Sequence, residues 1–325
     1  MTLHRRSFSI ALLAGLAAAR VHAQGQAGLP RILVGFPAGG SADATARRLS
    51  EAWRGRLADQ VLVDNKVGAG GRIAVGALKD AAPDGQTMLL SPASMFTIYQ
   101  HAFRKLQYNP ATDVTPVSPV CEFAFGFGIG PKVPDTVKTV AQYLDWAKAN
   151  PRESAYASPA AGAAPHFLGD MLSRASGVAM QHVPYRGAAP GLQDLMGGQI
   201  ASAMETLGDF LPHMSSGRVR VLAVTSTSRS RFLPEVPTFT EQGFKTLVAT
   251  ETYGLFLPAK AQSALTDKLH ELVRVALREK AMVDGLAKLG FEPVAKAPDE
   301  YARLLAAERE QWGPIVKASG FSSDD

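Results

Sequence analysis

The sequence predicts an α/β protein made of two lobes, and three observations support this fold class. Short runs rich in β-branched residues alternate with helical patterns, which is typical of a parallel sheet covered by helices. The alternation begins a second time near residue 139. Two extended, apolar, glycine-containing segments, Val117–Ile129 and Leu247–Leu257, bracket that second repeat. If both cross between the lobes they form a hinge, and a cleft between such lobes closes on a ligand. The alternative is two independent domains in tandem.

The first lobe is expected to begin with a strand and a helix. Arg31–Phe36 is mostly apolar, and Ala42–Leu57 carries Trp53 and other apolar residues on one helical face. A turn follows at 83–85, where Pro, Asp and Gly are adjacent. The same reasoning predicts a second strand, a second helix and a third strand: Val61–Asn65, Arg72–Ala82 and Thr87–Ser91.

The second lobe repeats this order, and further helices end the chain. Its expected helices are Thr139–Asn150, His166–Ser176 and Ala188–Gly197, and its expected strands are Ala155–Ser158, Met180–Val183, Ile200–Glu205 and Val219–Ser226. The C-terminal helices, with no strand among them, are Leu265–Glu279, Ala281–Leu289 and Pro298–Ala318. Since the second crossing segment leads back, lobe 1 is predicted to hold residues 24–125 and 252–325, and lobe 2 residues 126–251.

The composition is that of a soluble globular protein. Of the 325 residues 46% are apolar and 19% charged, which supports sizeable cores and excludes a mainly disordered chain. Beyond the N-terminus no stretch keeps about 18 uncharged apolar residues, which excludes a protein with several membrane spans. The single cysteine, Cys121, excludes an internal disulfide and a Cys-rich metal site, and its apolar neighbours favour an inert thiol.

Residues 1–23 have the three-part layout of a cleaved secretory signal peptide. Arg5 and Arg6 form a positive start, an apolar stretch follows, and Val21–Ala23 ends in a small residue before Gln24. We therefore expect an exported protein. The arginine pair also fits a twin-arginine signal. The alternative is a membrane anchor, against which the short apolar stretch argues.

The charge balance argues against a polyanion-binding protein. The full chain carries 34 Lys and Arg residues against 29 Asp and Glu residues, a formal net charge of +5. Removal of residues 1–23 takes away Arg5, Arg6 and Arg20 and no acid, which leaves 31 against 29, or +2. So small an excess gives no basic surface for nucleic acid.

Four strand-to-helix junctions are rich in glycine or other small residues: 37–43, 68–71, 158–165 and 184–187. Glycine lets the backbone approach a ligand, and the free amides at the start of a helix favour an anion. Ligands of open α/β sheets bind at the carboxyl ends of strands, so all four loops are expected to line one cleft. For any one loop the alternative is an ordinary tight turn.

The candidate ligand-binding residues belong to these loops and to neighbouring strand ends. A side chain at Gly40 is expected to block the backbone or the φ/ψ that the loop requires. His166 fits packing at a helix start equally well, Arg186 fits a surface arginine, and Glu205 fits a solvated carboxylate. The candidates are Pro37, Ala38, Gly39, Gly40, Ser41, Asp43, Gly70, Gly71, Ser91, Ser94, Ser158, Ala161, Gly162, His166, Tyr185, Arg186, Gly187 and Glu205.

Catalytic, nucleotide-binding and metal-binding motifs are missing. The chain has no G-x-S-x-G, no H-E-x-x-H and no G-x-x-x-x-G-K-[ST], and the segment from Gly68 lacks the last glycine of G-x-G-x-x-G. The histidines after residue 23 are scattered singly, without ligand-type spacing. We therefore expect no enzyme activity, no cofactor and no metal.

Several segments share a pattern in a fixed order: Ile32–Arg47 (ILVGFPAGGSADATAR), Val63–Gly71 (VDNKVGAGG), Ala82–Thr87 (APDGQT), Val183–Gly187 (VPYRG), Gly197–Gln199, Leu222–Thr225 and Val236–Gly243. Together they resemble the tripartite tricarboxylate transporter receptors, the Bug family of periplasmic binding proteins, whose usual segments are VEN-x-x-GAGG, PDGYT and VPYKG. Asp64 replaces the usual glutamate and Gln86 the usual tyrosine. The resemblance covers essentially the whole chain after residue 23.

The resemblance implies a type II periplasmic-binding-protein fold, in which two β/α lobes joined by two crossover strands close around a ligand cleft. It implies a small carboxylate ligand (a di- or tricarboxylate, an acidic amino acid or an aromatic carboxylate), held by loop amides and bridging waters. It also implies a periplasmic location and a partner, a membrane permease of one large and one small subunit.

Three function hypotheses follow. The first is a carboxylate receptor that delivers its ligand to such a permease. The second is a receptor of the same fold that signals to a sensor kinase. The third is an exported hydrolase on this scaffold, against which the missing nucleophile–base spacing argues.

We expect the mature protein to lack residues 1–23. N-terminal sequencing of exported material should begin at or near Gln24. An intact Met1 on exported protein would contradict both the cleavage and the assigned location.

Overall fold

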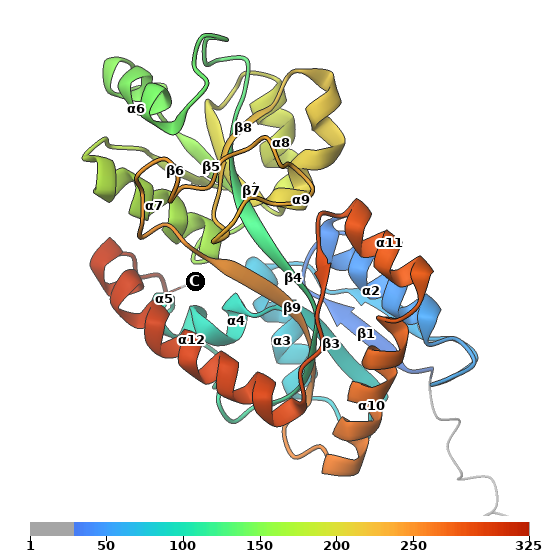
Figure 1. Ribbon diagram of the computed structural model, residues 1–325. Coiled ribbons are helices and arrows are strands. Elements are labelled where there is room, and N and C mark those ends of the chain that lie inside the picture. Colours follow the sequence, from blue (N-terminus) through green and yellow to red (C-terminus); the bar gives the residue numbers. More distant parts are fainter. Residues whose placement is uncertain (1–28, 325) are drawn as a thin grey trace, which may run out of the picture.

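The computed structural model describes residues 29–324, so the predicted signal peptide lies outside the described residues. Figure 1 shows two α/β lobes with β4 (Val114–Ile129) and β9 (Thr250–Pro258) running between them. The strands form one sheet in the order β2-β1-β3-β9-β4-β7-β5-β6, and β8 and β10 also pair with β4.

The first lobe is built on β2, β1, β3, β9 and the first part of β4. β1 is parallel to β2 and β3, whereas β9 is antiparallel to β3 and β4. The C-terminal helices return to this lobe, as Figure 1 shows. Its elements besides β4 and β9 are β1 (Arg31–Val34), α2 (Ser41–Ala52), β2 (Leu62–Asn65), η2 (Ala69–Gly71), α3 (Arg72–Lys79), β3 (Thr87–Pro92), α4 (Ser94–Thr97), α5 (Tyr99–Ala102), α10 (Ser263–Ala276), α11 (Lys280–Lys288), β10 (Glu292–Pro293) and α12 (Pro298–Ser319).

The second lobe continues the same sheet through the last part of β4. β7 and β8 pair antiparallel with β4, and β5 is parallel to β6 and β7. Its elements are α6 (Val140–Ala149), β5 (Tyr156–Ser158), α7 (Ala164–Ser176), β6 (His182–Pro184), α8 (Ala188–Met196), β7 (Ser202–Thr206), α9 (Leu207–Phe210), η3 (Leu211–Ser216) and β8 (Arg220–Val224).

The lobes meet where β4 changes its partners. Up to Ala124, β4 pairs with β9, and from Phe125 it pairs with β7. The predicted boundary at residue 125 falls at this change, and the boundary at residue 252 falls inside β9. A single long strand therefore belongs to both lobes.

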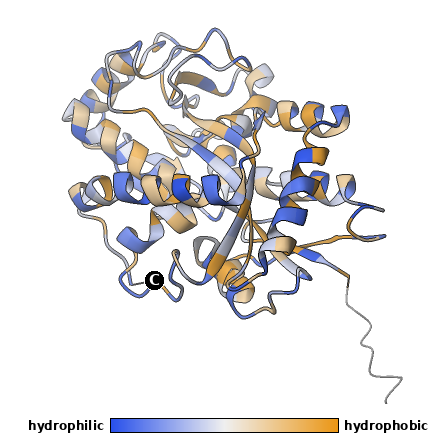
Figure 2. Ribbon diagram, turned by 60° about the horizontal axis from the view of Figure 1, so that its bottom comes forward, coloured by the Kyte–Doolittle hydropathy of each residue, from blue (hydrophilic) through white to orange (hydrophobic). Residues whose placement is uncertain are grey.

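Apolar burial explains how the layers pack. Ala46 and Leu49 of α2, and Trp53 directly after it, are completely buried on the face that the periodicity predicts. Figure 2 shows mostly hydrophobic strands at the centre and helices of mixed hydropathy outside them. None of the helices within residues 29–324 is long and apolar enough to cross a membrane.

The structure corrects three predicted elements. α2 ends before residue 57, because the chain turns through Gly55, whose φ is +74°. β6 begins at His182, two residues after the start of the predicted strand Met180–Val183. β10 lies among the C-terminal helices, where the sequence predicts no strand; it pairs with Cys121 and Glu122 of β4, and a two-residue strand shows no periodicity for a pattern to detect.

Thr225 ties the two crossing segments together where the lobes meet. Its hydroxyl accepts a hydrogen bond from the Phe125 amide at 2.9 Å and donates one to the Ala249 carbonyl at 2.7 Å. Its own amide donates to the Phe125 carbonyl, and its carbonyl accepts from the Ala249 amide. The side chain is fully buried, so water cannot replace these bonds.

We expect Thr225→Val to lower the free energy of unfolding by about 1–3 kcal/mol, because it leaves a buried donor and a buried acceptor without partners. Urea denaturation measures the change. Thr225→Ser, which keeps the hydroxyl, is the control and should retain more of the stability. A valine variant as stable as wild type would mean that the hydroxyl hydrogen bonds of Thr225 do not stabilise the junction of the lobes.

Candidate functional site

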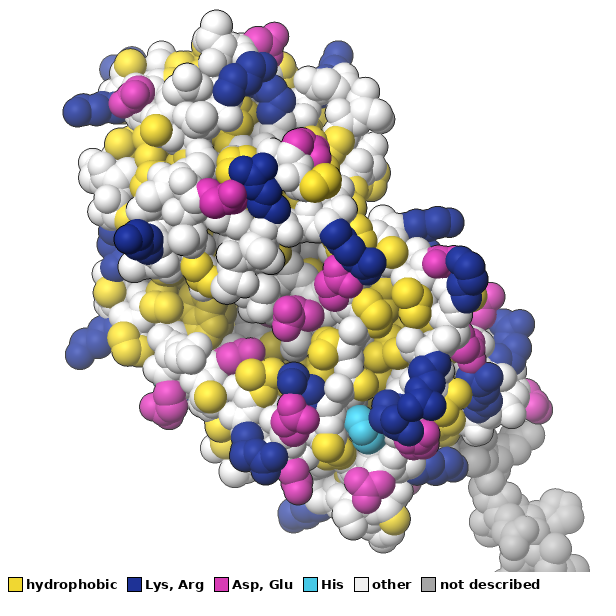
Figure 3. Space-filling model, viewed as in Figure 1, with side chains coloured by type: hydrophobic (Ala, Val, Ile, Leu, Met, Phe, Trp, Pro, Cys, Tyr) yellow, Lys and Arg dark blue, Asp and Glu magenta, His cyan; other side chains and the backbone are white. Residues whose placement is uncertain are grey.

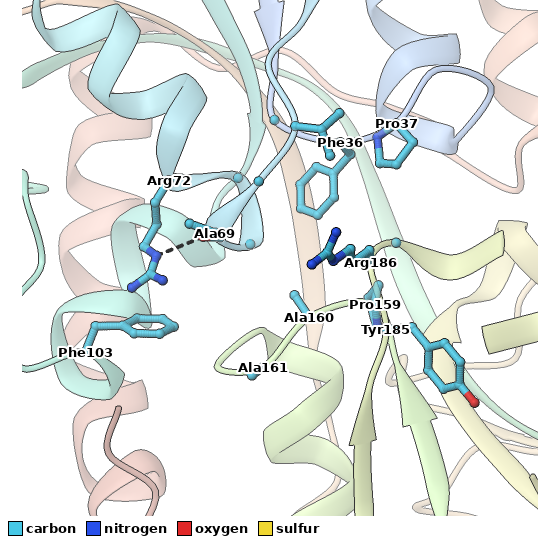
Figure 4. A pocket seen from close by; sticks show the side chains of 16 residues that line it. Phe36, Pro37, Ala69, Arg72, Phe103, Pro159, Ala160, Ala161, Tyr185 and Arg186 are labelled. Atoms are coloured by element: carbon cyan, nitrogen blue, oxygen red, sulfur yellow. Dashed lines mark hydrogen bonds between the residues drawn. The ribbon is translucent and has the colours of Figure 1, made fainter. Parts of the chain in front are cut away.

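A cavity of about 530 Å³ lies between the two lobes. Loops of lobe 1 form one wall and loops of lobe 2 the other, as Figure 4 shows. Its volume is in the usual range of small-molecule sites. The lining residues are Gly35, Phe36, Pro37, Val67, Gly68, Ala69, Gly70, Gly71, Arg72, Phe103, Pro159, Ala160, Ala161, Tyr185, Arg186 and Gly187.

The lobe 1 wall depends on two glycines that meet backbone to backbone. A Cβ added at Gly35 would lie 2.6 Å from the Cα of Gly71. Gly71 has φ +95°, and a Cβ there would lie 1.9 Å from the Cε of Met95. Because neither position has room for a side chain, the loop after β1 and the loop before α3 pack closely and present their backbone to the cavity.

All four predicted loops reach the cavity, but the first does so only through Pro37. Seven of the predicted residues line it: Pro37, Gly70, Gly71, Ala161, Tyr185, Arg186 and Gly187. Gly187 lies in the loop before α8, and a Cβ there would be 3.4 Å from Pro37 of the other lobe. The lobes therefore approach each other at this edge. Contact of these residues with a ligand stays a prediction.

Asp43 shapes the loop after β1 and lies outside the cavity lining. It is buried and accepts hydrogen bonds from the Gly39 amide and Arg47 Nε, both at 2.9 Å, and from Asn65 Nδ2 at 3.0 Å. Burial opposes its ionisation, but the bonds from Arg47 and the Gly39 amide hold the pKa of Asp43 below its ordinary value. Its neighbour Ser41 hydrogen-bonds Tyr253 at 3.0 Å.

The structure corrects the argument about Gly40. Its φ is −75°, which any residue adopts, and a Cβ there would lie 3.5 Å from the Pro37 carbonyl oxygen, an ordinary contact. Gly39, with φ +85°, is the position whose backbone favours glycine. Ala38 and Gly39 are exposed and outside the cavity lining.

Two stacked histidines support the loop 159–162 from behind. The rings of His166 and His182 lie 3.8 Å apart between centroids. His166 Nδ1 accepts from the Gly162 amide at 3.1 Å, and His182 Nε2 hydrogen-bonds Ser158 Oγ at 2.7 Å. Burial lowers the pKa of His166 to about 4 and that of His182 to about 3, the latter also through His166. Ser158, Gly162 and His166 thus lie outside the lining, in the packing beneath it.

Ser91 and Ser94 also lie outside the cavity lining. The Ser91 hydroxyl donates to the Pro92 carbonyl at 3.1 Å. The Ser94 amide donates to Glu251 at 2.7 Å, beside a second, much smaller cavity that Glu308 also lines. Burial raises the pKa of Glu251 to about 7 and that of Glu308 to about 8, although the Ser94 bond opposes the rise at Glu251.

Glu205 is fully buried at the end of β7, away from the cavity lining. Neither carboxyl oxygen has a hydrogen-bond partner among residues 29–324. Burial, and then the nearby Asp209, raise the pKa of Glu205 well above its ordinary value.

Arg72 is the functional candidate that sequence reasoning missed. Its Nε donates to the Ala69 carbonyl at 2.8 Å, and its guanidinium carbon lies 3.9 Å above the Phe103 ring. It directly follows the glycines of the second predicted loop, and this position was the available signal. Pro159 and Ala160 line the cavity within the predicted loop 158–165, whereas no local pattern marks Phe36 and Phe103.

The cavity lining is cationic, whereas the surface is mixed. Arg72 and Arg186 are its charged residues, and none of the lining residues is acidic. In Figure 3 the basic and acidic side chains are interspersed over the face in view. Residues 29–324 hold no group of three or more His, Cys, Asp or Glu side chains that could bind a metal ion. The site can therefore hold an anion.

Comparison with known proteins gives a family and a fold. The family model described as "Tripartite tricarboxylate transporter family receptor" matches residues 45–321. Protein BugT of Bordetella pertussis is 33% identical over 291 residues, which are 89% of each chain. The UPF0065 protein in the gbd 5' region of Cupriavidus necator is 30% identical over 293 residues, 90% of this chain and 88% of that one.

Solved structures agree with this fold. The periplasmic binding protein BugD superposes with a TM-score of 0.84 at 29% identity, over 90% of this chain and 98% of that one. MatC from Rhodopseudomonas palustris, with bound malate, superposes with a TM-score of 0.82 at 26% identity, over 89% of this chain and 98% of that one. An R. palustris protein with adipate superposes with a TM-score of 0.86 at 26% identity, over 91% of this chain and 98% of that one. The predicted type II periplasmic-binding-protein fold is confirmed.

The histidine stack predicts a dependence of stability on pH. Both imidazoles are neutral in the folded protein but have an ordinary pKa near 6.5 when unfolded. The unfolded chain therefore binds more protons between about pH 6.5 and pH 4, and this pair makes the free energy of unfolding fall as the pH falls. Glu251 and Glu308, with raised pKa values, act in the opposite direction, so the test compares variants.

We expect His182→Gln to reduce this acid-side slope by up to about 1.4 kcal/mol per pH unit near pH 5. Urea denaturation from pH 4 to pH 7 measures it. His101→Gln, at an exposed imidazole, controls for the loss of one histidine. Equal slopes for wild type and His182→Gln would contradict the neutral stack.

Proposed function

Because the chain belongs to the tripartite tricarboxylate transporter receptor family, we propose that it is an extracytoplasmic receptor that captures a small carboxylate in its interlobe cavity. The family and its structural neighbours are binding proteins, and this chain is a binding protein and not an enzyme. The hydrolase hypothesis is therefore excluded.

The observation that carries the proposal is the cationic lining of the cavity. Two guanidinium groups and the glycine-rich backbone of two loops face one cavity that contains no acidic side chain. Anions bind at such backbone amides and at arginine forks. The relatives with bound malate and adipate support a carboxylate as the anion.

We further propose that cleft closure traps the ligand and that the loaded receptor delivers it to a membrane permease of the tripartite tricarboxylate type. The description of the family supports this partner. The same family and the N-terminal sequence support a periplasmic location reached through a cleaved signal peptide. Closure is a hinge motion for which β4 and β9 provide the crossing strands.

We expect carboxylates, and not their neutral analogues, to raise the thermal unfolding midpoint. A ligand at 100 times its dissociation constant adds about 2.7 kcal/mol of stability, which corresponds to a shift of several degrees. Differential scanning fluorimetry with di- and tricarboxylates, acidic amino acids and aromatic carboxylates, beside their amides and sugars, measures it. The bound compound should be recovered unchanged after overnight incubation.

A shift by sugars or nucleotides alone would contradict the carboxylate assignment. Chemical conversion of the added compound would contradict a receptor role. Native mass spectrometry of gently purified protein adds an independent readout, because a bound solute adds its own mass to that of the chain.

A further inference from the structure

We propose that Arg72 and Arg186 form two anion subsites on opposite walls of the cavity, so that the receptor selects ligands with two anionic groups and rejects those that also carry an ammonium group. This inference rests on the proposed function and narrows its ligand class. It assigns the subsite of lobe 1 to Arg72 and the subsite of lobe 2 to Arg186.

Arg72 is held in place, yet part of its guanidinium is unused. The bond from Nε to the Ala69 carbonyl and the Phe103 ring beneath the guanidinium fix its plane, as Figure 4 shows. Among the described residues, neither terminal nitrogen has a hydrogen-bond or ion-pair partner. A fixed guanidinium loses little side-chain entropy when it binds a carboxylate, so these two nitrogens form a prepared fork.

Arg186 supplies the opposite charge site from lobe 2. It precedes Gly187, the residue before α8, and its guanidinium extends toward Phe36 of lobe 1 in Figure 4. Within residues 29–324 it makes no hydrogen bond and no ion pair. Because the two arginines belong to different lobes, a ligand that binds both of them holds the cleft closed.

The lining offers no acidic side chain to an ammonium group. A ligand ammonium needs a carboxylate or several carbonyl oxygens, and it is repelled by guanidinium groups in the same cavity. Asp194, the acid that contacts a lining residue, already accepts the Tyr185 hydroxyl at 2.7 Å. Acidic amino acids therefore differ from the matching dicarboxylates in the one group that this cavity disfavours.

Apolar surface separates the two subsites. Ala160 lies between the two arginines in Figure 4, and Phe36 and Pro159 lie beside Arg186 in the same cavity lining. Such a wall accepts the hydrocarbon part of a ligand by burial of apolar area. The combination fits a dicarboxylate whose charges stand at its two ends.

The experiment is isothermal titration calorimetry with matched probes. Dicarboxylates of four to eight carbons are each compared with the monocarboxylate of the same length, and succinate and glutarate are compared with L-aspartate and L-glutamate. The protein forms are wild type, Arg72→Met, Arg72→Lys, Arg186→Met and the control Arg152→Met, which removes an exposed lobe 2 arginine outside the lining.

For wild type we expect the best dicarboxylate to bind roughly tenfold to a hundredfold more tightly than its monocarboxylate and its amino-acid analogue, as for one hydrogen-bonded charge pair. Arg72→Met and Arg186→Met should each weaken the dicarboxylate by a similar factor and the monocarboxylate much less. Arg72→Lys, which keeps the charge but loses the fork, should fall between. Arg152→Met should match wild type.

Two results would overturn the inference while the carboxylate receptor stands. One is equal affinity for mono- and dicarboxylates, and the other is a dicarboxylate preference that survives Arg72→Met in a variant with a wild-type circular dichroism spectrum. Tighter binding of L-aspartate than of succinate, or of L-glutamate than of glutarate, would also overturn the inference. Failure of every carboxylate to bind wild type would instead contradict the proposed function itself.

Discussion

The antiparallel pairing of β4 with β9 is the constraint on which the rest of the structure depends. Among the strands of residues 29–324, β4 is the one that pairs in both lobes, and β9 lies between it and β3. The cavity exists because these strands hold two β/α layers at a fixed pivot while their loops face each other. Thr225 adds side-chain hydrogen bonds at that pivot, where backbone pairing changes from one lobe to the other.

Two features determine the chemistry of the cavity between the lobes: small residues, which bring backbone to its wall, and the positive charge of two arginines. Gly35 and Gly71 allow two loops of lobe 1 to interlock, which leaves backbone, rather than side chains, to face the cavity. Arg72 stands at the end of that interlocked segment, and Arg186 stands at the start of a helix in the other lobe. The buried acids Glu205 and Glu251 lie outside the lining, so they do not neutralise the arginines there.

Sequence reasoning predicted the two lobes and most strands and helices, because burial periodicity is local. It also predicted the glycine loops, of which Gly70, Gly71 and Gly187 line the cavity. It could not separate residues that face the cavity from those that support it: Asp43 and His166 have suitable chemistry, but their partners come from tertiary packing. Phe103 and β10 depend on contacts with distant segments, which no local pattern encodes.

The position of β9 has a consequence for how the chain reaches its native state. Leu89 of β3 pairs with Phe256 of β9, so the sheet of the first lobe is interrupted until residue 258 has been synthesised. By then the whole second lobe has already been made. Contacts this distant in sequence slow folding, since a long loop must close before the pairing is gained. A chain that stops before β9 leaves β3 and the first part of β4 as two open sheet edges, which are surfaces prone to self-association.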